Sequence, residues 1–114
     1  MQEVLVTPGA FFEGYTIKEY KDPLSAEEIV YILEGYIRMI DNDKNKEYVK
    51  KCLSDGRKIA MVKLKQKAKD CNCNGIIGFN CSYLTFEPSN RILSNYFFCL
   101  VANGTPVIIE KKDN

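Results

Sequence analysis

The stretch that decides the fold runs from Lys50 to Ala68, continues through Lys69-Asp70-Cys71-Asn72-Cys73-Asn74, and ends in Gly75-Ile76-Ile77-Gly78-Phe79. Its first part predicts a helix, because apolar and small residues recur at steps of three or four: Val49, Leu53, Gly56, Ala60, Leu64 and Ala68. Either asparagine of the turn can adopt the left-handed conformation that ends a helix. We therefore predict a helix from Lys46 to about Asp70, a tight turn, and a strand from Gly75 to Phe86.

The predicted helix has a stripe that is apolar and, in places, very small. Gly56, Ala60 and Ala68 let a flat partner such as a sheet approach closely, and Cys52 and Ile59 widen the stripe. The lysines mostly avoid it, and those of the last turns suit the negative end of the helix dipole. The helix is therefore expected to pack along a sheet.

Alternating and β-prone residues predict the strands of that sheet. A strand is expected over Gly14 to Tyr20, which is rich in β-branched and aromatic residues, and a shorter one over Val4 to Thr7. In the strand that follows the helix, one face is more apolar and is expected to meet the helix: Ile77, Phe79, Cys81 and Tyr83.

The segment from Tyr96 to Ala102 predicts a strand that is apolar on both faces. Tyr96, Phe98 and Leu100 line one face, and Phe97, Cys99 and Val101 line the other. One long helix is too little to cover both faces, so the pattern predicts that a neighbouring subunit covers one of them.

The residues that follow predict a final hairpin. Asn103-Gly104 is typical of a sharp reversal, after which Thr105 to Glu110 is expected to return as a last strand. Pro106 is expected near the edge of the sheet, because proline cannot donate a hydrogen bond to a neighbouring strand.

The segment at 24–33 supports two interpretations. Ser25 and Glu28 fit a capping box behind Pro23, and the apolar residues that follow have helical spacing. Local chemistry therefore predicts a helix over about residues 25–40, which Gly35 would weaken by about 1 kcal/mol. The alternative, a strand, follows from the family resemblance given below.

Size and composition bound the class of protein. The 114 residues are expected to form one domain, 1–114, and the net charge of +1 gives no overall attraction to nucleic acid or to an anionic membrane. No segment has the ~20 apolar residues that cross a bilayer, and the N-terminus does not resemble a signal peptide. We predict a cytoplasmic protein whose five cysteines are reduced, with neither nucleic acid nor membrane as a partner.

Residues able to carry chemistry are few. The chain has no histidine, which excludes Ser–His and Cys–His catalysis, and we predict that it is not an enzyme. Cys71 and Cys73 are the candidate metal ligands, because two thiolates favour a thiophilic ion, although both are also interpretable as incidental turn residues. A closed zinc site needs four ligands, so only a symmetric assembly that pools these thiols could build one. Cys52, Cys81 and Cys99 are expected to be core residues.

Four segments, in order and at matching spacing, resemble the YbjQ-type family, whose general description is "putative heavy-metal-binding domain". Gly14-Tyr15-Thr16-Ile17-Lys18-Glu19-Tyr20 resembles its opening GY-x-I-x-EY strand, and residues 48–60 resemble its long helix. Residues 67–79 resemble the join between that helix and the next strand, and residues 101–110 resemble the closing SASGTAVVVE segment.

The resemblance implies an α+β domain, similar to a dodecin subunit, in which a small antiparallel sheet packs on one long helix. It also implies a ring-shaped homopentamer, a strand that continues through about Tyr31, and no known enzymatic mechanism. Cys71 and Cys73 stand where the family has glycine and a small residue, so they are not its shared ligands.

Two hypotheses of function follow. The first is a non-enzymatic, ring-forming protein, a pentamer or a multiple of one, that binds a metal ion or small ligand at subunit interfaces. The second is a metal-sequestering or redox protein that acts through Cys71 and Cys73, with a thiophilic metal ion as its cofactor.

Overall fold

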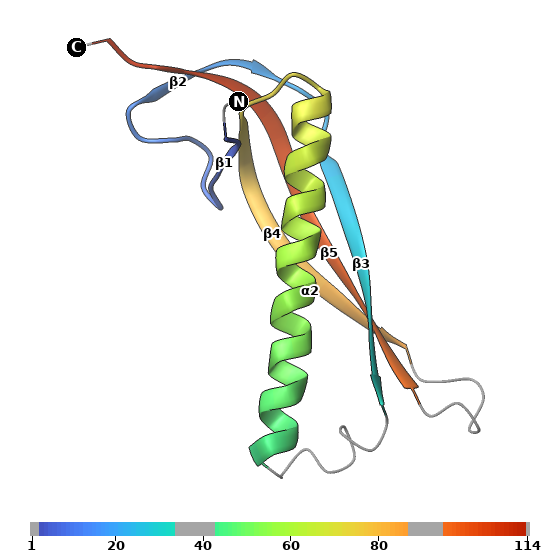
Figure 1. Cartoon of the computed structure of the whole chain (residues 1–114). Helices are drawn as coiled ribbons and strands as arrows, with labels where there is room; N and C mark the ends of the chain where they lie inside the picture. The colour runs from blue at the N-terminus through green and yellow to red at the C-terminus, as the bar shows by residue number, and fades with distance from the viewer. Residues whose placement is uncertain (1–2, 34–42, 87–94, 114) are drawn as a thin grey trace.

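The computed structural model describes residues 3–33, 43–86 and 95–113 and contains one long helix against a five-stranded sheet (Figure 1). The elements, in chain order, are β1 (Leu5–Val6), β2 (Tyr15–Tyr20), β3 (Leu24–Leu33), α2 (Asp43–Asp70), β4 (Gly75–Phe86) and β5 (Asn95–Lys111). The predicted α+β architecture is therefore confirmed, with the helix starting three residues earlier than its sequence pattern indicated.

β5 is the central strand of the sheet. β4 pairs with it along one side in antiparallel register, while β2 and β3 follow one another along its other side, also antiparallel. β1 pairs with the first two residues of β4 in parallel register, so the sheet is mixed rather than wholly antiparallel as expected. α2 covers one face of the sheet, mainly over β3 and β5 (Figure 1).

The segment at 24–33 is a strand, so the helix predicted by its capping box is wrong over these residues. All ten residues of β3 have a register partner on β5, from Leu24 opposite Gly104 to Leu33 opposite Asn95. This pairing outweighs the local signal of Ser25 and Glu28, because it gives backbone hydrogen bonds and buries Ala26 and Ile32 under α2. Residues 34–40 of the predicted helix lie outside the described residues.

The hairpin predicted at Asn103-Gly104 does not exist, because β5 runs without interruption through both residues. Asn103 lies between Ser25 of β3 and Asn80 of β4, and its amide donates to the Asn80 Oδ1 at 3.2 Å. A side chain at Gly104 would overlap Ile76 and touch Leu64. Glycine is therefore present here for close packing beneath the helix and not for a turn.

Pro106 is buried in the central strand, which corrects the prediction that it lies near an edge. Its carbonyl accepts a hydrogen bond from the Lys21 N–H at 2.9 Å, at the gap between the end of β2 and the start of β3. The proline nitrogen, on the same side of the strand, also faces this gap, so no ladder hydrogen bond is lost.

A bulge in β4 changes which residues face the helix. The register between β4 and β5 shifts between Ile77 and Asn80, and Gly78 has a φ of 62°. As a result Ile76 packs under α2, whereas Ile77 packs on the opposite face with Val107 and Ile109. The predicted helix-facing set is therefore wrong at Ile77 but correct from Phe79 onwards, where the alternation resumes in the other phase.

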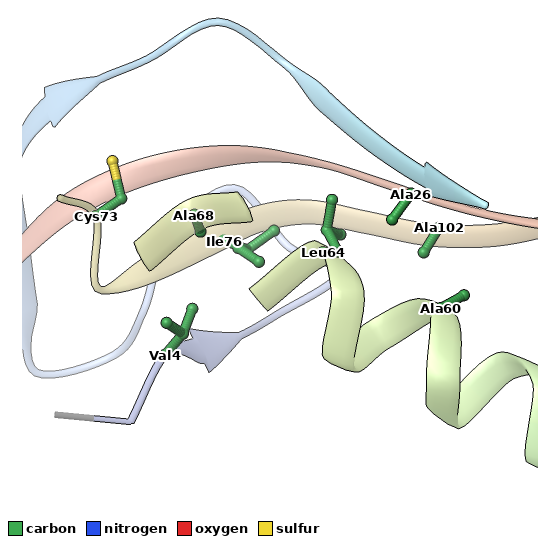
Figure 2. Close-up of a cluster of buried hydrophobic side chains, with 8 residues drawn as sticks. All are labelled: Val4, Ala26, Ala60, Leu64, Ala68, Cys73, Ile76 and Ala102. Atoms are coloured by element: carbon green, nitrogen blue, oxygen red, sulfur yellow. The ribbon is translucent and has the colours of Figure 1, made fainter. Parts of the chain in front are cut away.

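The main core lies between α2 and the sheet, as Figure 2 shows, and its members come from α2, β3, β4, β5 and the residues just before β1 and β4. It consists of Val4, Ala26, Ala60, Leu64, Ala68, Cys73, Ile76 and Ala102. A smaller cluster of Ile32, Val49 and Phe98 continues the contact toward the start of the helix. The helix stripe predicted from spacing is buried except for Leu53, which is half-buried, and the predicted extension to Ile59 is wrong because that side chain is 44% exposed.

Candidate functional site

The turn that carries Cys71 and Cys73 is a helix-ending motif. Asn72 adopts a left-handed conformation, with φ of 62°, as predicted for one of the two asparagines. The Cys73 N–H donates to the Ala68 carbonyl at 2.9 Å and the Asn72 N–H to the Lys69 carbonyl at 2.9 Å. This is the Schellman pattern, in which the residue after the left-handed position packs back on the last helical turn. Cys73 does so, in the same cluster as Ala68 (Figure 2).

Asn74 fixes the turn to the sheet. Its side chain accepts a hydrogen bond from the Ile109 N–H at 2.8 Å and donates one to the Ile109 carbonyl at 2.9 Å. The amide thus substitutes for a backbone partner at the start of β4. The backbone and the Asn74 amide therefore hold the two cysteines in place, and the thiols are not needed for this.

The environment of the Cys73 thiol favours its protonated form. The side chain is 4% exposed, and burial raises the pKa of the thiol above its ordinary value, as does the nearby Cys71, while Lys21 acts in the opposite direction. The Sγ atom lies 3.7 Å from the Cys71 carbonyl oxygen. Because the thiolate is the metal ligand and the nucleophile, this position disfavours both activities within one protomer.

The described residues do not fit a closed heavy-metal site. Among them, no three histidine, cysteine, aspartate or glutamate side chains are placed to hold a metal ion together. Cys71 and Cys73 therefore supply at most two sulfur ligands, whereas a structural zinc site takes four. A metal role for the pair requires ligands from another subunit.

The other three cysteines are less buried than their sequence pattern indicated. Cys52, Cys81 and Cys99 are all half-buried, and no cysteine is in a disulfide within the described part of the chain. Cys81 lines a groove beside the helix, and Cys99 lies on the sheet face that the helix does not cover.

That uncovered face carries an apolar row across three strands. Ile29 of β3 and Leu84 of β4 both lie in register with Cys99 of β5, and the next row along places Val101 on the same face. Ile29 is 53% exposed, Leu84 is 58% exposed, and the adjacent Tyr31 is 60% exposed. We call these five residues the open face. α2 covers the opposite side of these strands. Within the described part of the chain, nothing covers the open face.

The same face is closed at the other end of the sheet. There Phe12, from the segment before β2, packs with Ile77, Val107 and Ile109, and Tyr15 and Ile17 add to the cluster. The sheet therefore has one face covered along its length by α2 and a second face covered over only part of it.

The outer edge of β3 is partly protected by the helix. Lys67 donates to the Ser25 carbonyl at 2.7 Å, and Lys63 donates to the Glu27 carbonyl at 3.3 Å and to the Glu28 carboxylate at 2.8 Å. Lysines at an exposed strand edge discourage uncontrolled pairing with other chains.

Comparison with known proteins places the chain in a family. The family model YbjQ_1, described as "Putative heavy-metal-binding", matches residues 4–110, which is nearly the whole chain. The chain belongs to the YbjQ family. This confirms the resemblance drawn from the four segments of sequence.

Relatives and a solved structure agree with that assignment. A UPF0145 protein from Persephonella marina is 27% identical, over 94% of this chain and 100% of the relative. One from Listeria ivanovii is 28% identical, over 96% and 99%. A crystal structure of a DUF74-family protein of unknown function from Pediococcus pentosaceus aligns with a TM-score of 0.66 at 24% identity, over 94% of this chain and 98% of that one. This structural likeness shows the fold.

Sequence reasoning about this YbjQ-family chain identified the turn cysteines but missed the groove beside the helix. Its apolar floor includes Met61, Val62 and Phe79, and no prediction was made for the first two. The pair Met61-Val62 could have indicated it, because these two adjacent apolar residues lie outside the main stripe of a lysine-rich helix.

No helix among the described residues combines the length and the apolar character needed to span a membrane.

Proposed function

We propose that this YbjQ-family chain works as a non-enzymatic homo-oligomer, a ring of five copies or a multiple of five, with a small ligand or metal ion held between subunits. The observation that carries the proposal is the open face: a row of apolar side chains, Ile29, Cys99 and Leu84, that lies in register across three strands and is accessible to solvent. Neighbouring apolar side chains that are exposed together in this way are typical of contact surfaces.

The shape of the protomer supports the same proposal. Its Cα radius of gyration is 17.7 Å, whereas a compact chain of this length has about 13 Å. The principal extents are 59 × 27 × 24 Å, so the sheet and helix form a long, thin layer (Figure 1). A thin layer of this kind buries little surface alone and gains stability when copies pack together.

A ring of identical subunits also offers ligand sites that one protomer lacks. Each copy contributes the same residues around the symmetry axis, so a site at the axis or between neighbouring copies is completed by residues from more than one subunit. The second candidate, a thiophilic metal ion on Cys71 and Cys73, depends on such pooling, because one protomer supplies only two sulfurs. What favours it is that both cysteines lie in one turn, with the Cys73 Sγ 3.7 Å from the Cys71 carbonyl oxygen.

The test of assembly is a double substitution on the open face, Ile29→Glu with Leu84→Glu. We expect the wild type to sediment as an oligomer, and the double variant to sediment as a 13.1 kDa protomer that keeps its helical circular dichroism. Ile59→Glu is the control, because it places a glutamate at an exposed apolar residue of α2, away from the open face, and should leave the assembly intact. A double variant that remains fully assembled would overturn the role of the open face.

The test of the metal candidate is elemental analysis of the purified oligomer. If the pair binds a thiophilic ion, Cys71→Ser/Cys73→Ser lowers the metal content while the sedimented mass stays the same. Unchanged metal content in this variant would remove the pair from consideration.

A further inference from the structure

A groove runs between α2 and the outer part of β4, on the helix side of the sheet. α2 packs mainly on β3 and β5 and makes few contacts with β4, so the part of β4 beyond its bulge is left without a helix above it. The groove has a volume of about 390 Å³, within the range of small-molecule sites. It lies within one protomer and is separate from the open face.

The lining of the groove divides into a floor and a rim. Phe79 and Cys81 come from β4, and Met61 and Val62 from α2; together they form an apolar floor. Val62 is 65% exposed, which is unusual for a valine in a helix whose other exposed residues are mostly charged. The rim consists of Arg57, Lys58 and Lys65, and no acidic side chain lines the groove.

The helix places these residues on one side. Residues 54, 57, 58, 61, 62 and 65 follow the spacing of a single helical face, with the apolar pair in the middle and the cations on either side. The distance along the axis from Arg57 to Lys65 is about 12 Å, from a rise of about 1.5 Å per residue. A medium-length acyl chain laid along the floor therefore ends beside a cation.

Two of the three cations are available to a ligand. Lys65 has a long contact with Glu3, 3.8 Å from nitrogen to carboxylate oxygen. Within the described part of the chain, neither Arg57 nor Lys58 has an acidic partner within ion-pair distance. Burial raises the pKa of the Cys81 thiol and Arg57 lowers it, so the Arg57 guanidinium lies near the floor of the groove.

We propose that this groove binds the free carboxylate of a medium-chain fatty acid. The chain would lie over Met61, Val62 and Phe79, and the carboxylate would pair with Arg57, whose planar guanidinium suits a two-oxygen partner, with Lys58 beside it. The inference rests on the charge complementarity of the rim and on the exposed apolar floor. It goes beyond the proposed assembly and does not depend on it.

Calorimetric titration of the assembled full-length protein with decanoate, below its micellar concentration, tests the proposal. Decanol and decyltrimethylammonium have similar chains but a neutral and a reversed head group, and we expect both to bind about tenfold more weakly or worse, as loss of a charged hydrogen-bond partner predicts. Equal binding of decanol and decanoate would overturn the role of the rim, and absence of decanoate binding would overturn the proposal.

Variants separate the groove from the rest of the helix. Arg57→Gln/Lys58→Gln is expected to weaken decanoate binding about tenfold or more without changing the sedimented mass. The matched control Lys50→Gln/Lys51→Gln removes two exposed charges from the same helix, outside the groove, and should leave binding unchanged.

Two further results would contradict the inference. If the Arg57→Gln/Lys58→Gln variant dissociates the oligomer, the groove is a subunit contact and not a ligand site. If the protein binds phospholipid vesicles through the groove but not free decanoate, its partner is a membrane surface. A failure of decanoate binding with the assembled mass intact leaves the proposed oligomer standing, so the two proposals fail separately.

Discussion

At Gly56 the backbone of α2 lies close against the sheet. A side chain here would overlap Leu100 of β5 and the Val30 side chain of β3. The helix tolerates the low helix propensity of glycine at this position because the missing side chain lets the backbone pack directly over two strands.

We predict that Gly56→Ala destabilises the protein by about 1–3 kcal/mol, because overpacking outweighs the gain in helix propensity. Urea unfolding monitored by circular dichroism measures this. Asp55→Ala, at the exposed neighbouring position, is the control and should change the stability by less than about 0.5 kcal/mol. A Gly56→Ala variant more stable than the wild type would show that the helix does not approach so closely.

Cys73 makes stability depend on pH in the alkaline range. Because burial raises its pKa, the folded protein keeps the thiol proton at pH values where the unfolded chain, whose thiol titrates near 9.0, has lost it. The unfolded state then binds fewer protons than the folded state. The stability that the buried, protonated thiol contributes is therefore complete below the unfolded pKa and is lost as the pH rises through the folded pKa. We predict that the stability difference between wild type and Cys73→Ala narrows from about pH 9 upwards. A difference that stays constant to about pH 10 would contradict the buried, protonated thiol.

At the scale of elements, the bulge in β4 determines what lies on each face of the sheet. Gly78 has a φ of 62°, a conformation that costs other residues about 1–2 kcal/mol. The extra residue turns Ile77 to the face with Phe12 and brings Phe79 and Cys81 to the helix side, where they form the floor of the groove.

We therefore predict that Gly78→Ala lowers the stability by about 1–2 kcal/mol, and that Gly78→Asn lowers it less, because asparagine tolerates the left-handed region. Equilibrium unfolding of the two variants compares them directly. Equal stability of wild type and Gly78→Ala would show that the strand is not bulged at this residue.

The elements that could be predicted from sequence are those whose signals are local and agree with their tertiary role. The stripe of α2 and the Asn72 turn belong to this class. The failures come from competition between scales: Ser25 and Glu28 carry a helix-start signal, but the pairing of β3 with β5 outweighs it. Gly104 carries a turn signal, but its real constraint is the side chain of Ile76 packed against it.

The candidate sites show the same limit. Cys71 and Cys73 are visible as a pair in the sequence, yet the burial that disfavours a Cys73 thiolate depends on the cluster of Val4, Ala68 and Ile76 around it. The groove depends on where α2 lies across the sheet and on the shifted phase of β4. Neither fact is encoded in the spacing of any one segment.

At the scale of the whole molecule, the protomer is a two-layer structure in which one face of the sheet is only partly covered. α2 covers one face of the sheet, while the segment around Phe12 covers only one end of the other. The rest of that second face holds Ile29, Leu84 and Tyr31, each more than half exposed. The doubly apolar strand inferred from residues 96–102 thus has one face under the helix, at Phe98, Leu100 and Ala102, and half-buried Cys99 and Val101 on the other.

The most direct test of the account is the mass of the wild-type protein in solution, measured by sedimentation equilibrium at micromolar concentration. We predict an assembly of five times the 13.1 kDa protomer, or a multiple of that mass. A single species at 13.1 kDa that remains folded and soluble would contradict the central claim, because the open face would then be stable without a neighbouring copy.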